Sequence, residues 1–218
     1  FKQKTAYEIR LSLVGSEMCI RDRSIHGDDR TDEYYWLSNR GDSKVIDYLN
    51  SENQYREDFM KDYKSLEKDI FSEIKSRIKE DDSSVPYFDN GYFYYTRYEK
   101  DKQYPIYCRK KESLNSKEEI LIDANIMSEG HEYFRVGDIE VSPNNKMMAY
   151  SIDTVSRRIY TIYFMDLETR KVSEKSIPNT SGSITWANDN KTIFYNLKDL
   201  KTLRTERVMK YNLSLIHI

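Results

Sequence analysis

Very few residues of this chain are of the kinds that build metal sites or disulfide frameworks. Its 218 residues include 2 cysteines and 3 histidines. The spacing of Cys19 and Cys108 fits neither a disulfide framework nor a metal-binding motif. The sequence therefore predicts no metal and no cofactor.

Long apolar runs and long basic runs are missing as well. No segment approaches the roughly 18 apolar residues that suggest a membrane span, and no series typical of a secretion signal opens the chain. The 35 basic and 37 acidic residues leave a formal net charge of −2. Because no basic cluster stands out, nucleic-acid binding has little support. We expect a cytoplasmic location, with neither a membrane nor a nucleic acid as partner.

Aromatic residues, by contrast, are plentiful. They make up 13% of the chain, with 19 tyrosines and 8 phenylalanines. Disordered chains are poor in aromatic residues, so this composition indicates a folded protein. Tyrosine also favours β-strands, where its ring packs and its hydroxyl can face water.

The two ends of the chain differ in character from the rest. Residues 11–23 and residues 213–218 resemble peptides that result when sequencing-adapter DNA is translated. We therefore expect residues 1–23 and 213–218 to be non-native and to pack poorly against the rest. The alternative is a genuine apolar strand at each end.

An arm and two helices are predicted at the start of the remaining sequence, over residues 24–80. After an extended arm at residues 26–40, Asp42 or Ser43 is a suitable helix N-cap. Apolar residues then recur at roughly helical spacing and predict helices over 43–60 and 63–79. We interpret both apolar stripes as packing surfaces for a following domain and not as a binding groove.

From Asp81 onward the pattern changes to short strands. The dipeptide Asn90-Gly91 is typical of a tight hairpin turn. Pro86 disfavours helix at the residue before it. Strands are predicted at residues 92–98, 105–109, 120–123, 147–152, 158–166 and 192–196.

An internal repeat organises these strands. Residues 141–151 align with residues 186–196 at an offset of 45 positions, and a weaker copy lies at 89–95. This period is typical of the four-stranded blades of a β-propeller, whereas a β-sandwich, the alternative, does not usually repeat a turn signature in this way. The fold class is thus mainly β, with residues 81–212 forming a partial propeller of about two to three blades after the helical segment.

The repeat makes specific predictions about packing. Its two good copies should lie in two consecutive sheets, with a third sheet begun at the C-terminal end. Met148 and Ile193 should occupy equivalent buried positions. Val141 and Trp186 should both face the core between sheets.

A catalytic serine motif is not found in the sequence. None of the 7 glycines begins Gly-x-Ser-x-Gly, the sharp strand-to-helix turn that exposes a nucleophilic serine. His26 and His131 are interpreted as loop histidines with local hydrogen bonds, and not as metal ligands or general bases. Cys108 is interpreted as a buried thiol in a strand. No catalytic, cofactor-binding or metal-binding residue is predicted.

Two other polar features are candidates for binding sites. The acidic residues of the arm could attract a basic peptide, but a solvated charged segment is the preferred interpretation. They are Asp28, Asp29, Asp32 and Glu33. The segment Ser181-Gly182-Ser183 resembles a phosphate-binding turn only superficially, because no P-loop lysine follows it.

Several segments nevertheless resemble one known family. The run HGDDRTDEYYWL at residues 26–37 leads into Arg40-Gly41-Asp42-Ser43 and a helix, and in this order it is similar to the N-terminal segment of the prolyl oligopeptidase family of serine peptidases, in particular its oligopeptidase B group. Further segments that fit are residues 77–87, 104–110, 129–134 and 177–183.

The resemblance implies a seven-bladed propeller, of which this chain would hold the first part. It also implies a C-terminal α/β-hydrolase domain, missing here, as the partner of the propeller and of the N-terminal helices. The full-length enzyme would cleave short peptides after Lys or Arg, and the propeller would gate access to the catalytic cleft. A non-catalytic propeller that serves as a binding module is the alternative function. On either interpretation, this chain alone should be inactive.

Overall fold

The structure is a computed structural model that describes residues 21–213. The chain divides into two compact units, residues 1–78 and residues 79–218. No helix among the described residues is long and apolar enough to cross a membrane.

Unit 1 consists of a β-hairpin followed by helices. Its elements in chain order are β1 (Arg21–Ile25), β2 (Asp28–Asp32), the 3-10 helix η1 (Tyr35–Ser38), α2 (Ser43–Met60), the 3-10 turn η2 (Lys61–Tyr63) and α3 (Lys64–Ser76). The hairpin turns at His26 and Gly27, whose φ angles of 57° and 80° suit a tight two-residue turn. Both predicted helices are confirmed, although α3 ends three residues earlier than predicted.

The start of α2 follows from one side chain. Asp42 has an extended backbone, and its carboxylate accepts a hydrogen bond from the Lys44 backbone N–H at 2.9 Å. This bond satisfies one of the amides that have no partner within the first turn of a helix. Val45 is the one buried residue of α2, and α3 has none.

The predicted apolar stripes are therefore largely exposed. On α2, Phe59 is 53% exposed, and on α3, Phe71 is 66% exposed. Neighbouring rings of the α2 stripe contact each other along the helix, with 6.3 Å between the centroids of Tyr55 and Phe59. Such contacts cover little apolar surface, so the stripes stay available for packing.

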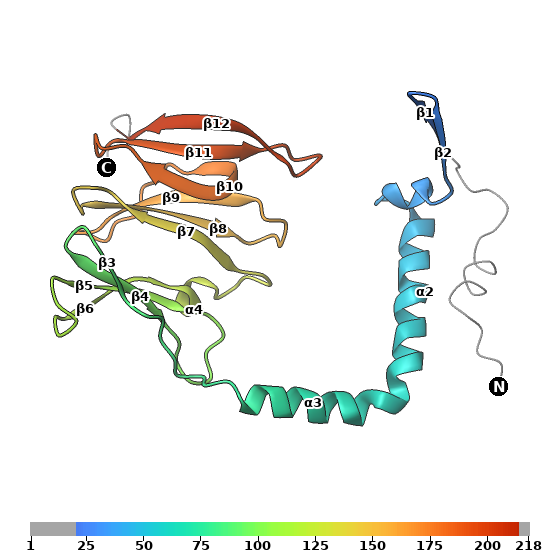
Figure 1. Cartoon of the computed structure of the whole chain (residues 1–218), viewed down its shortest axis with the longest axis horizontal. Helices are drawn as coiled ribbons and strands as arrows, with labels where there is room; N and C mark the ends of the chain where they lie inside the picture. The colour runs from blue at the N-terminus through green and yellow to red at the C-terminus, as the bar shows by residue number, and fades with distance from the viewer. Residues whose placement is uncertain (1–20, 214–218) are drawn as a thin grey trace. The chain divides into compact units, whose positions relative to one another are not determined.

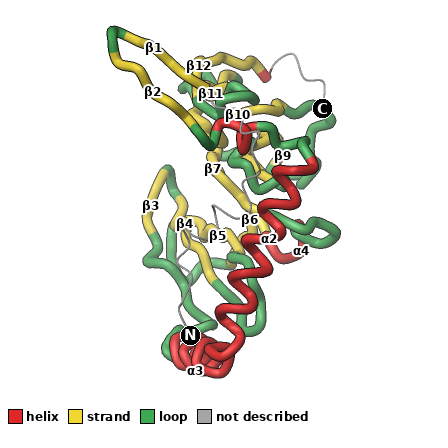
Figure 2. The backbone as a smooth tube through the Cα atoms, turned by 90° about the vertical axis from the view of Figure 1, so that its right-hand side faces the viewer, coloured by secondary structure: helices red, strands yellow, loops and turns green. Residues whose placement is uncertain are grey.

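Unit 2 is built from strands (Figures 1 and 2). Those strands are β3 (Tyr87–Asp89), β4 (Tyr92–Arg97), β5 (Ile106–Lys111), β6 (Glu118–Asp123), β7 (Arg135–Val141), β8 (Met147–Asp153), β9 (Tyr160–Asp166), β10 (Ile177–Trp186), β11 (Thr192–Lys198) and β12 (Thr205–Asn212), with the short helix α4 (Ala124–Met127) between β6 and β7. The six strands predicted with residue bounds are confirmed, whereas no bounds were predicted for β3, β7, β10 and β12.

The prediction that the two repeat copies lie in separate sheets is wrong. Strands β3 to β6 form one four-stranded sheet, but β7 to β12 form a single six-stranded antiparallel sheet in the order β12-β11-β10-β9-β8-β7. The two repeat copies join at the start of β10, where this strand pairs with β9. Ile177 pairs with Ile162 and Thr180 pairs with Tyr160, and the register is irregular between these two pairs. Strand β10 has 10 residues, long enough to pair with β9 at one end and with β11 at the other.

Beyond this join the six-stranded sheet folds back on itself. The Ile184 N–H donates to a carboxylate oxygen of Asp138 at 3.0 Å, and the Trp186 indole N–H donates to the Glu140 carbonyl at 3.0 Å. The second half of β10 thus lies against β7. Gly182 has a φ of 94° and lies where an added Cβ would come within 2.8 Å of the Tyr160 ring, so this crossing requires glycine. Figure 1 shows the resulting three stacked layers, β3–β6, β7–β9 and β10–β12.

Two apolar cores fill the spaces between these layers. The first joins Leu121 and Ile122 of β6 to Met148 and Tyr150 of β8. The second joins the β8–β9 face to the β10–β11 face through Ala149, Ile162, Phe164, Ile184, Ile193 and Tyr195. Each layer therefore buries its apolar face against the next, as repeat units do.

The repeat is confirmed at the level of hydrogen bonds. The Ser142 N–H donates to the Met147 carbonyl at 2.8 Å, and 45 positions later the Ala187 N–H donates to the Thr192 carbonyl at 2.8 Å. Met148 and Ile193 are both 0% exposed, as predicted. Val141 and Trp186 pack against the two cores but remain partly exposed.

The asparagine turns of the repeat also contact one another. Asn90, Asn145 and Asn190 are equivalent in the alignment, and all three have a positive φ, between 45° and 60°. The Asn90 side-chain amide donates to the Pro143 carbonyl at 2.6 Å, and the Asn145 side-chain amide donates to the Asn90 carbonyl at 3.1 Å. The Asn190 side-chain oxygen accepts from the Asn144 N–H at 2.7 Å. These side chains tie each layer's turn to the next.

The prediction of poor packing at residues 213–218 is wrong at its first residue. Leu213 is 8% exposed and belongs to the second apolar core. Its N–H donates to the Lys191 carbonyl at 2.7 Å, as the Leu167 N–H donates to the Lys146 carbonyl at 2.8 Å. Leu213 thus takes the place of Leu167 in the repeat. Residues 1–20 and 214–218 lie outside the described residues.

Candidate functional site

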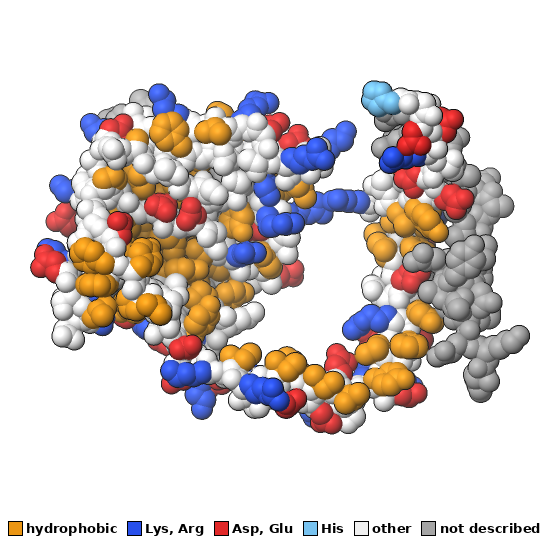
Figure 3. Space-filling view, viewed as in Figure 1, with side chains coloured by type: hydrophobic (Ala, Val, Ile, Leu, Met, Phe, Trp, Pro, Cys, Tyr) orange, Lys and Arg blue, Asp and Glu red, His pale blue; other side chains and the backbone are white. Residues whose placement is uncertain are grey.

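A cleft between the first layer and strand β7 is the candidate functional site. Its volume is about 240 Å³. Both walls belong to unit 2, and hydrophobic side chains gather over the front of this unit, with acidic side chains among and beside them (Figure 3). The residues that line the cleft are Ser84, Tyr87, Tyr94, Tyr95, Thr96, Tyr107, Cys108, Leu121, Gly137, Asp138 and Ile139.

Two irregularities of strand pairing open this cleft. The register of β5 with β6 shifts at Tyr107 and Cys108, which leaves Leu121 as an extra residue. The register of β7 with β8 shifts between Val136 and Ile139. Such bulges bend a strand and redirect its side chains, and they are common beside functional sites. Here both bulges border the same cleft.

The β7 bulge is held by buried hydroxyl bonds. The Asp138 N–H donates to the Ser151 hydroxyl oxygen at 2.9 Å, and that hydroxyl donates to the Gly182 carbonyl at 2.8 Å. Ser151 is 0% exposed. A Cβ on Gly137 would come within 2.5 Å of the Ser151 hydroxyl oxygen, so the bulge needs glycine there. The position of Asp138 at the cleft is therefore built into the packing of three strands.

Tyrosines form the opposite wall. The rings of Tyr87 and Tyr94 are cross-strand neighbours and stack, with 5.5 Å between their centroids and 21° between their planes. Burial raises the pKa of Tyr94 and of Tyr107. Burial also raises the pKa of Tyr87, and the nearby charges of Glu140, Asp89 and Asp138 raise it further. The phenol hydroxyls at the cleft are thus neutral over the physiological pH range.

A buried arginine supports this wall from within the layer. Arg109 is 3% exposed, and it donates two hydrogen bonds to the Glu119 carboxylate at 2.7 and 3.1 Å. Its guanidinium carbon lies 4.0 Å from the centroid of the Tyr92 ring. Burial lowers the pKa of Arg109, but hydrogen bonds to Glu119 and Tyr94 outweigh it, so the pKa is raised and the charge is kept. Its Nη1 atom finds no partner among the described residues.

Three carboxylates act electrostatically on the Tyr87 phenol, from Asp89 of β3 and from Asp138 and Glu140 of β7. Burial raises the pKa of Glu140 to about 7, and the charges of Asp138 and Asp89 contribute to this rise. Among residues 21–213 the Glu140 carboxylate makes no hydrogen bond and no ion pair, whereas Asp138 accepts the backbone bond from β10 described above. Glu140 is therefore a partly buried acid for which residues 21–213 supply no ion pair.

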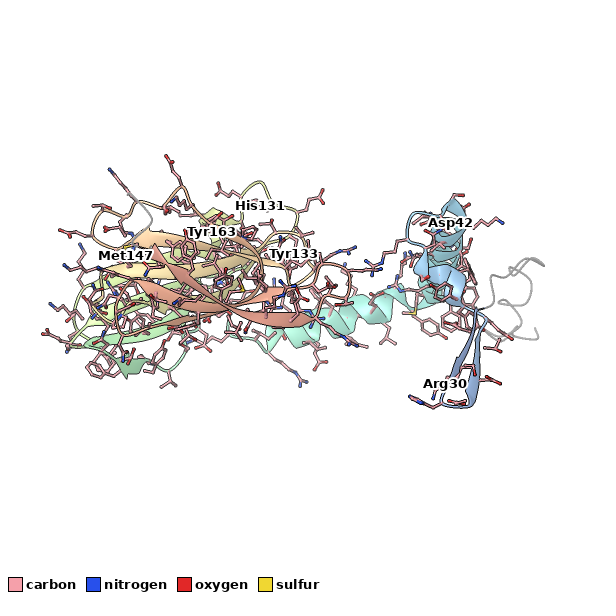
Figure 4. All side chains as sticks on the ribbon, turned by 90° about the horizontal axis from the view of Figure 1, so that it is seen from above. Arg30, Asp42, His131, Tyr133, Met147 and Tyr163 are labelled. Carbon is pink, nitrogen blue, oxygen red and sulfur yellow. The ribbon has the colours of Figure 1, made fainter. Side chains whose placement is uncertain are left out.

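The histidines and the cysteine lie where the sequence suggested. His26 is in the β1–β2 turn. His131 is on the loop before β7 (Figure 4), and its ring centroid lies 5.9 Å from that of Phe134. Cys108 is 1% exposed in β5, and burial raises the pKa of its thiol to about 12. A thiol with this pKa is a poor nucleophile at neutral pH.

The two polar features of the sequence are also placed. The four acidic residues of the arm are exposed on or just after the β1–β2 hairpin, where Asp28 pairs with Arg30 at 2.8 Å and Asp32 accepts from the Tyr34 N–H at 3.0 Å. Ser181-Gly182-Ser183 lies within strand β10 and not in a turn. No group of three potential metal ligands is found in the part of the chain that the structure describes.

The cleft itself was not predicted. Its tyrosines read as ordinary strand residues, and the bulges that open it depend on pairing between distant segments. A sequence signal that could have pointed to β7 is Gly137-Asp138, because a glycine inside a strand pattern often marks a bulge. The cleft combines aromatic faces with the Asp138 carboxylate, which has backbone hydrogen bonds but no ion pair among residues 21–213, and such a lining suits the binding of a small group.

Comparison with known proteins places this architecture in a family. The profile of the prolyl oligopeptidase N-terminal β-propeller domain matches residues 20–215. The sequence is 38% identical over 200 residues to dipeptidyl aminopeptidase BI of Pseudoxanthomonas mexicana, which covers 84% of this chain and 28% of that protein. It is 33% identical over 182 residues to protease 2 of Moraxella lacunata, with 80% of this chain and 26% of that protein covered.

Solved structures show the same likeness. Oligopeptidase B from Leishmania major is similar with a TM-score of 0.77 and 33% identity, over 87% of this chain and 28% of that one. Oligopeptidase B from Trypanosoma brucei, solved in a closed form with covalently bound antipain, is similar with a TM-score of 0.77 and 27% identity, over 91% of this chain and 30% of that one. The fold class is thus a partial β-propeller preceded by helices. The chain spans less than a third of the length of these relatives.

Proposed function

Because this chain belongs to the prolyl oligopeptidase family through its N-terminal β-propeller domain, we propose that it is the propeller part of a serine-type peptidase that cleaves short peptides after Lys or Arg. The observation that carries the proposal is the family match over residues 20–215. The likeness to two oligopeptidase B structures supports the choice of group within the family.

In this proposal the chemistry belongs to a second domain. An α/β-hydrolase domain would supply the serine, its general base histidine and the aspartate that orients the histidine. The propeller would act by covering the catalytic cleft, so that only short peptides reach the serine. A cytoplasmic location is part of this proposal.

The exposed helical stripes support a second contact with that domain. Ile70 and Ile74 on α3 are 47% and 55% exposed, and Leu49 on α2 is 48% exposed. Exposed apolar surface that is contiguous along a helix is typical of an interaction site. We assign the catalytic domain as the partner that covers both stripes.

Two experiments test the proposal. The gene downstream of the codon for Asn212 should encode Gly-x-Ser-x-Gly, followed in order by an aspartate and a histidine. A stop codon after the seventh blade would instead support the alternative, a non-catalytic binding propeller.

The second experiment concerns activity. The 218-residue chain should not hydrolyse an arginyl chromogenic peptide, whereas the longer gene product should. Hydrolysis by the purified chain that survives removal of contaminating proteases would contradict the assignment of the chemistry to another domain.

A further inference from the structure

We propose that the cleft between the first layer and β7 binds the cationic group of a peptide side chain, a guanidinium or an ammonium, at a subsite formed by the propeller alone. The inference deepens the proposed function, and its biological meaning rests on it. The binding itself requires only residues 84–140 and is measurable without any catalytic domain.

The first argument is size. A cleft of about 240 Å³ is smaller than the ~300–1,000 Å³ typical of pockets for whole small-molecule ligands. It suits one long side chain, with the remainder of the peptide outside. The bulges at Tyr107–Cys108 and at residues 136–139 keep this space open, because each displaces a strand segment from regular pairing.

The second argument is the aromatic wall. Tyr87, Tyr94 and Tyr107 lie on three adjacent strands, and cations bind favourably over the faces of such rings. The same layer already holds a guanidinium in this way, because that of Arg109 lies 4.0 Å from the Tyr92 centroid. Lys110 likewise places its ammonium 5.7 Å from the Tyr95 centroid. A cationic ligand would therefore make with the tyrosines of this wall the same cation–π contact that Arg109 and Lys110 make within the layer.

The third argument is the sign of the charge at the cleft. Asp138 lines it, and the charges of Glu140 and Asp89 act on the Tyr87 phenol of its wall. The charged groups that shift the pKa of Glu140 are Asp138 and Asp89, and both are acidic. A bound cation would balance the negative charge of the Glu140 carboxylate.

The unpaired Nη1 atom of Arg109 would favour the opposite ligand, an anion. Neither Arg109 nor Glu140 lines the cleft itself, and the Arg109 guanidinium acts on the Tyr94 phenol by lowering its pKa. The charge of Arg109, however, is already balanced by Glu119 at 2.7 Å. The carboxylates of Asp138 and Glu140 have no such ion pair among residues 21–213. We therefore assign a cation and treat anion binding as an outcome of the test.

The test titrates the whole 218-residue chain with two nearly isosteric ligands, Nα-acetyl-arginine amide and Nα-acetyl-citrulline amide. The citrulline compound keeps the shape but lacks the charge. Isothermal titration calorimetry should show that the arginine ligand binds about tenfold more tightly, and raising the salt concentration should weaken it. Equal affinities, or tighter binding of Nα-acetyl-glutamate amide, would overturn the proposal.

Variants locate the binding site. Glu140→Gln should weaken arginine binding about three- to tenfold, and Tyr87→Leu should weaken it about two- to fivefold, whereas Tyr87→Phe keeps the ring face and should bind like the parent. Glu168→Gln, which removes an exposed carboxylate from the β9 turn, is the matched control and should have no effect.

Equal losses in Glu140→Gln and Glu168→Gln would place the binding elsewhere and refute the proposed site. If Tyr87→Leu fails to fold, the comparison of arginine with citrulline on the parent chain still decides. Failure to bind arginine would leave the proposed peptidase function intact. A stop codon downstream would refute that function but not the binding.

Discussion

Helical unit 1 and layered unit 2 differ in where their apolar side chains lie. On α3 no residue is buried, and Ile70 is 47% exposed. On β8, five of the seven residues are buried, and Met148 is 0% exposed. Both segments carry several apolar residues, so apolar content alone does not determine burial. What determines it is whether a second apolar face lies opposite.

In unit 2 that second face is supplied by the next copy of the repeat. The β8–β9 face meets the β10–β11 face, and Phe164 of one stacks on Tyr211 of the neighbouring β12 at 5.7 Å between centroids. Unit 1 has no such repeat, and the apolar stripes of α2 and α3 stay exposed. The comparison therefore predicts that unit 2 is stabilised by its own sequence, and that the helices gain stability only when a partner binds.

The largest expected effect comes from comparing the same type of substitution, isoleucine to alanine, at one position in each unit. Ile193→Ala removes a side chain that is 0% exposed and should lower the free energy of unfolding of unit 2 by ~2–5 kcal/mol, because it leaves a cavity. Ile70→Ala, at a 47% exposed site, should change stability by less than about 0.5 kcal/mol. Urea unfolding followed by fluorescence measures both.

Each unit carries one tryptophan, Trp36 in unit 1 and Trp186 in unit 2. Trp36→Phe therefore isolates the signal of unit 2 for Ile193→Ala, and Trp186→Phe isolates that of unit 1 for Ile70→Ala. A loss of several kcal/mol in Ile70→Ala would break the comparison, because it would show that the α3 stripe is already packed in this chain.

The second prediction concerns the ionisation of Glu140, which destabilises unit 2. The pKa of Glu140 is raised from 4.5 to about 7, so the folded state holds this proton more tightly than the unfolded state. The stability that the protonated acid contributes is complete below pH 4.5 and is lost as the pH rises through about 7. Glu140→Gln should thus stabilise the chain at pH 8, by about 1–3 kcal/mol.

The measurement is urea unfolding of both proteins at several pH values from 4 to 8. The difference between the parent and Glu140→Gln should shrink toward zero at the acidic end. A constant difference over the whole range would show that ionisation of Glu140 does not destabilise the layers.

The layers were partly predictable because the repeat carries a local signal. Asn145 and Asn190 have a left-handed backbone that asparagine tolerates, and each precedes an apolar strand, so sequence alone marks the turn. The helices were predictable from their spacing and from the Asp42 cap. Strand β12, by contrast, contains mostly polar residues, and its assignment depends on pairing with β11.

The join at β10 and the cleft could not be predicted for a related reason. Ile177–Trp186 contains Pro178 and Gly182, which argue against a central strand, and only the approach of Tyr160 explains the glycine. The cleft results from two bulges on strands that are distant in sequence. Residue types such as Tyr94 indicate a strand but do not reveal which spaces between layers stay open.

A third, smaller effect is expected at the turns that connect the layers. Asn90 has a φ of 45°, and its side-chain amide donates to the Pro143 carbonyl at 2.6 Å. Asn90→Ala should lower stability by ~1–2 kcal/mol, because alanine disfavours this backbone and the bond to the next layer is lost. Asn90→Gly restores the backbone freedom, and about half of the loss should remain. Thermal unfolding compares the three proteins, and equal stability of Asn90→Ala and the parent would show that the turns do not couple the layers.

The smallest expected effect is a change in how the stability of unit 2 depends on acidic pH when one turn carboxylate is removed. The Asp189 carboxylate accepts hydrogen bonds from the Thr192 hydroxyl at 2.7 Å and from the Thr192 N–H at 2.8 Å, and these bonds hold its pKa below 3.8. Asp166 makes equivalent bonds with Thr169, at 2.9 and 2.7 Å, and its pKa is lowered in the same way.

Because the folded pKa is depressed, the stabilisation is present above pH 3.8 and is lost as the pH falls through the folded value. In Asp189→Asn the stability of unit 2 should therefore fall less steeply between pH 4 and pH 2 than in the parent. Glu168→Gln, which removes an exposed carboxylate from the turn of Asp166, should follow the parent. Unfolding followed through Trp186 distinguishes these cases. Identical acid profiles for Asp189→Asn and the parent would mean that this turn responds to acid as an exposed loop does, and that only the apolar cores distinguish the layers from the helices.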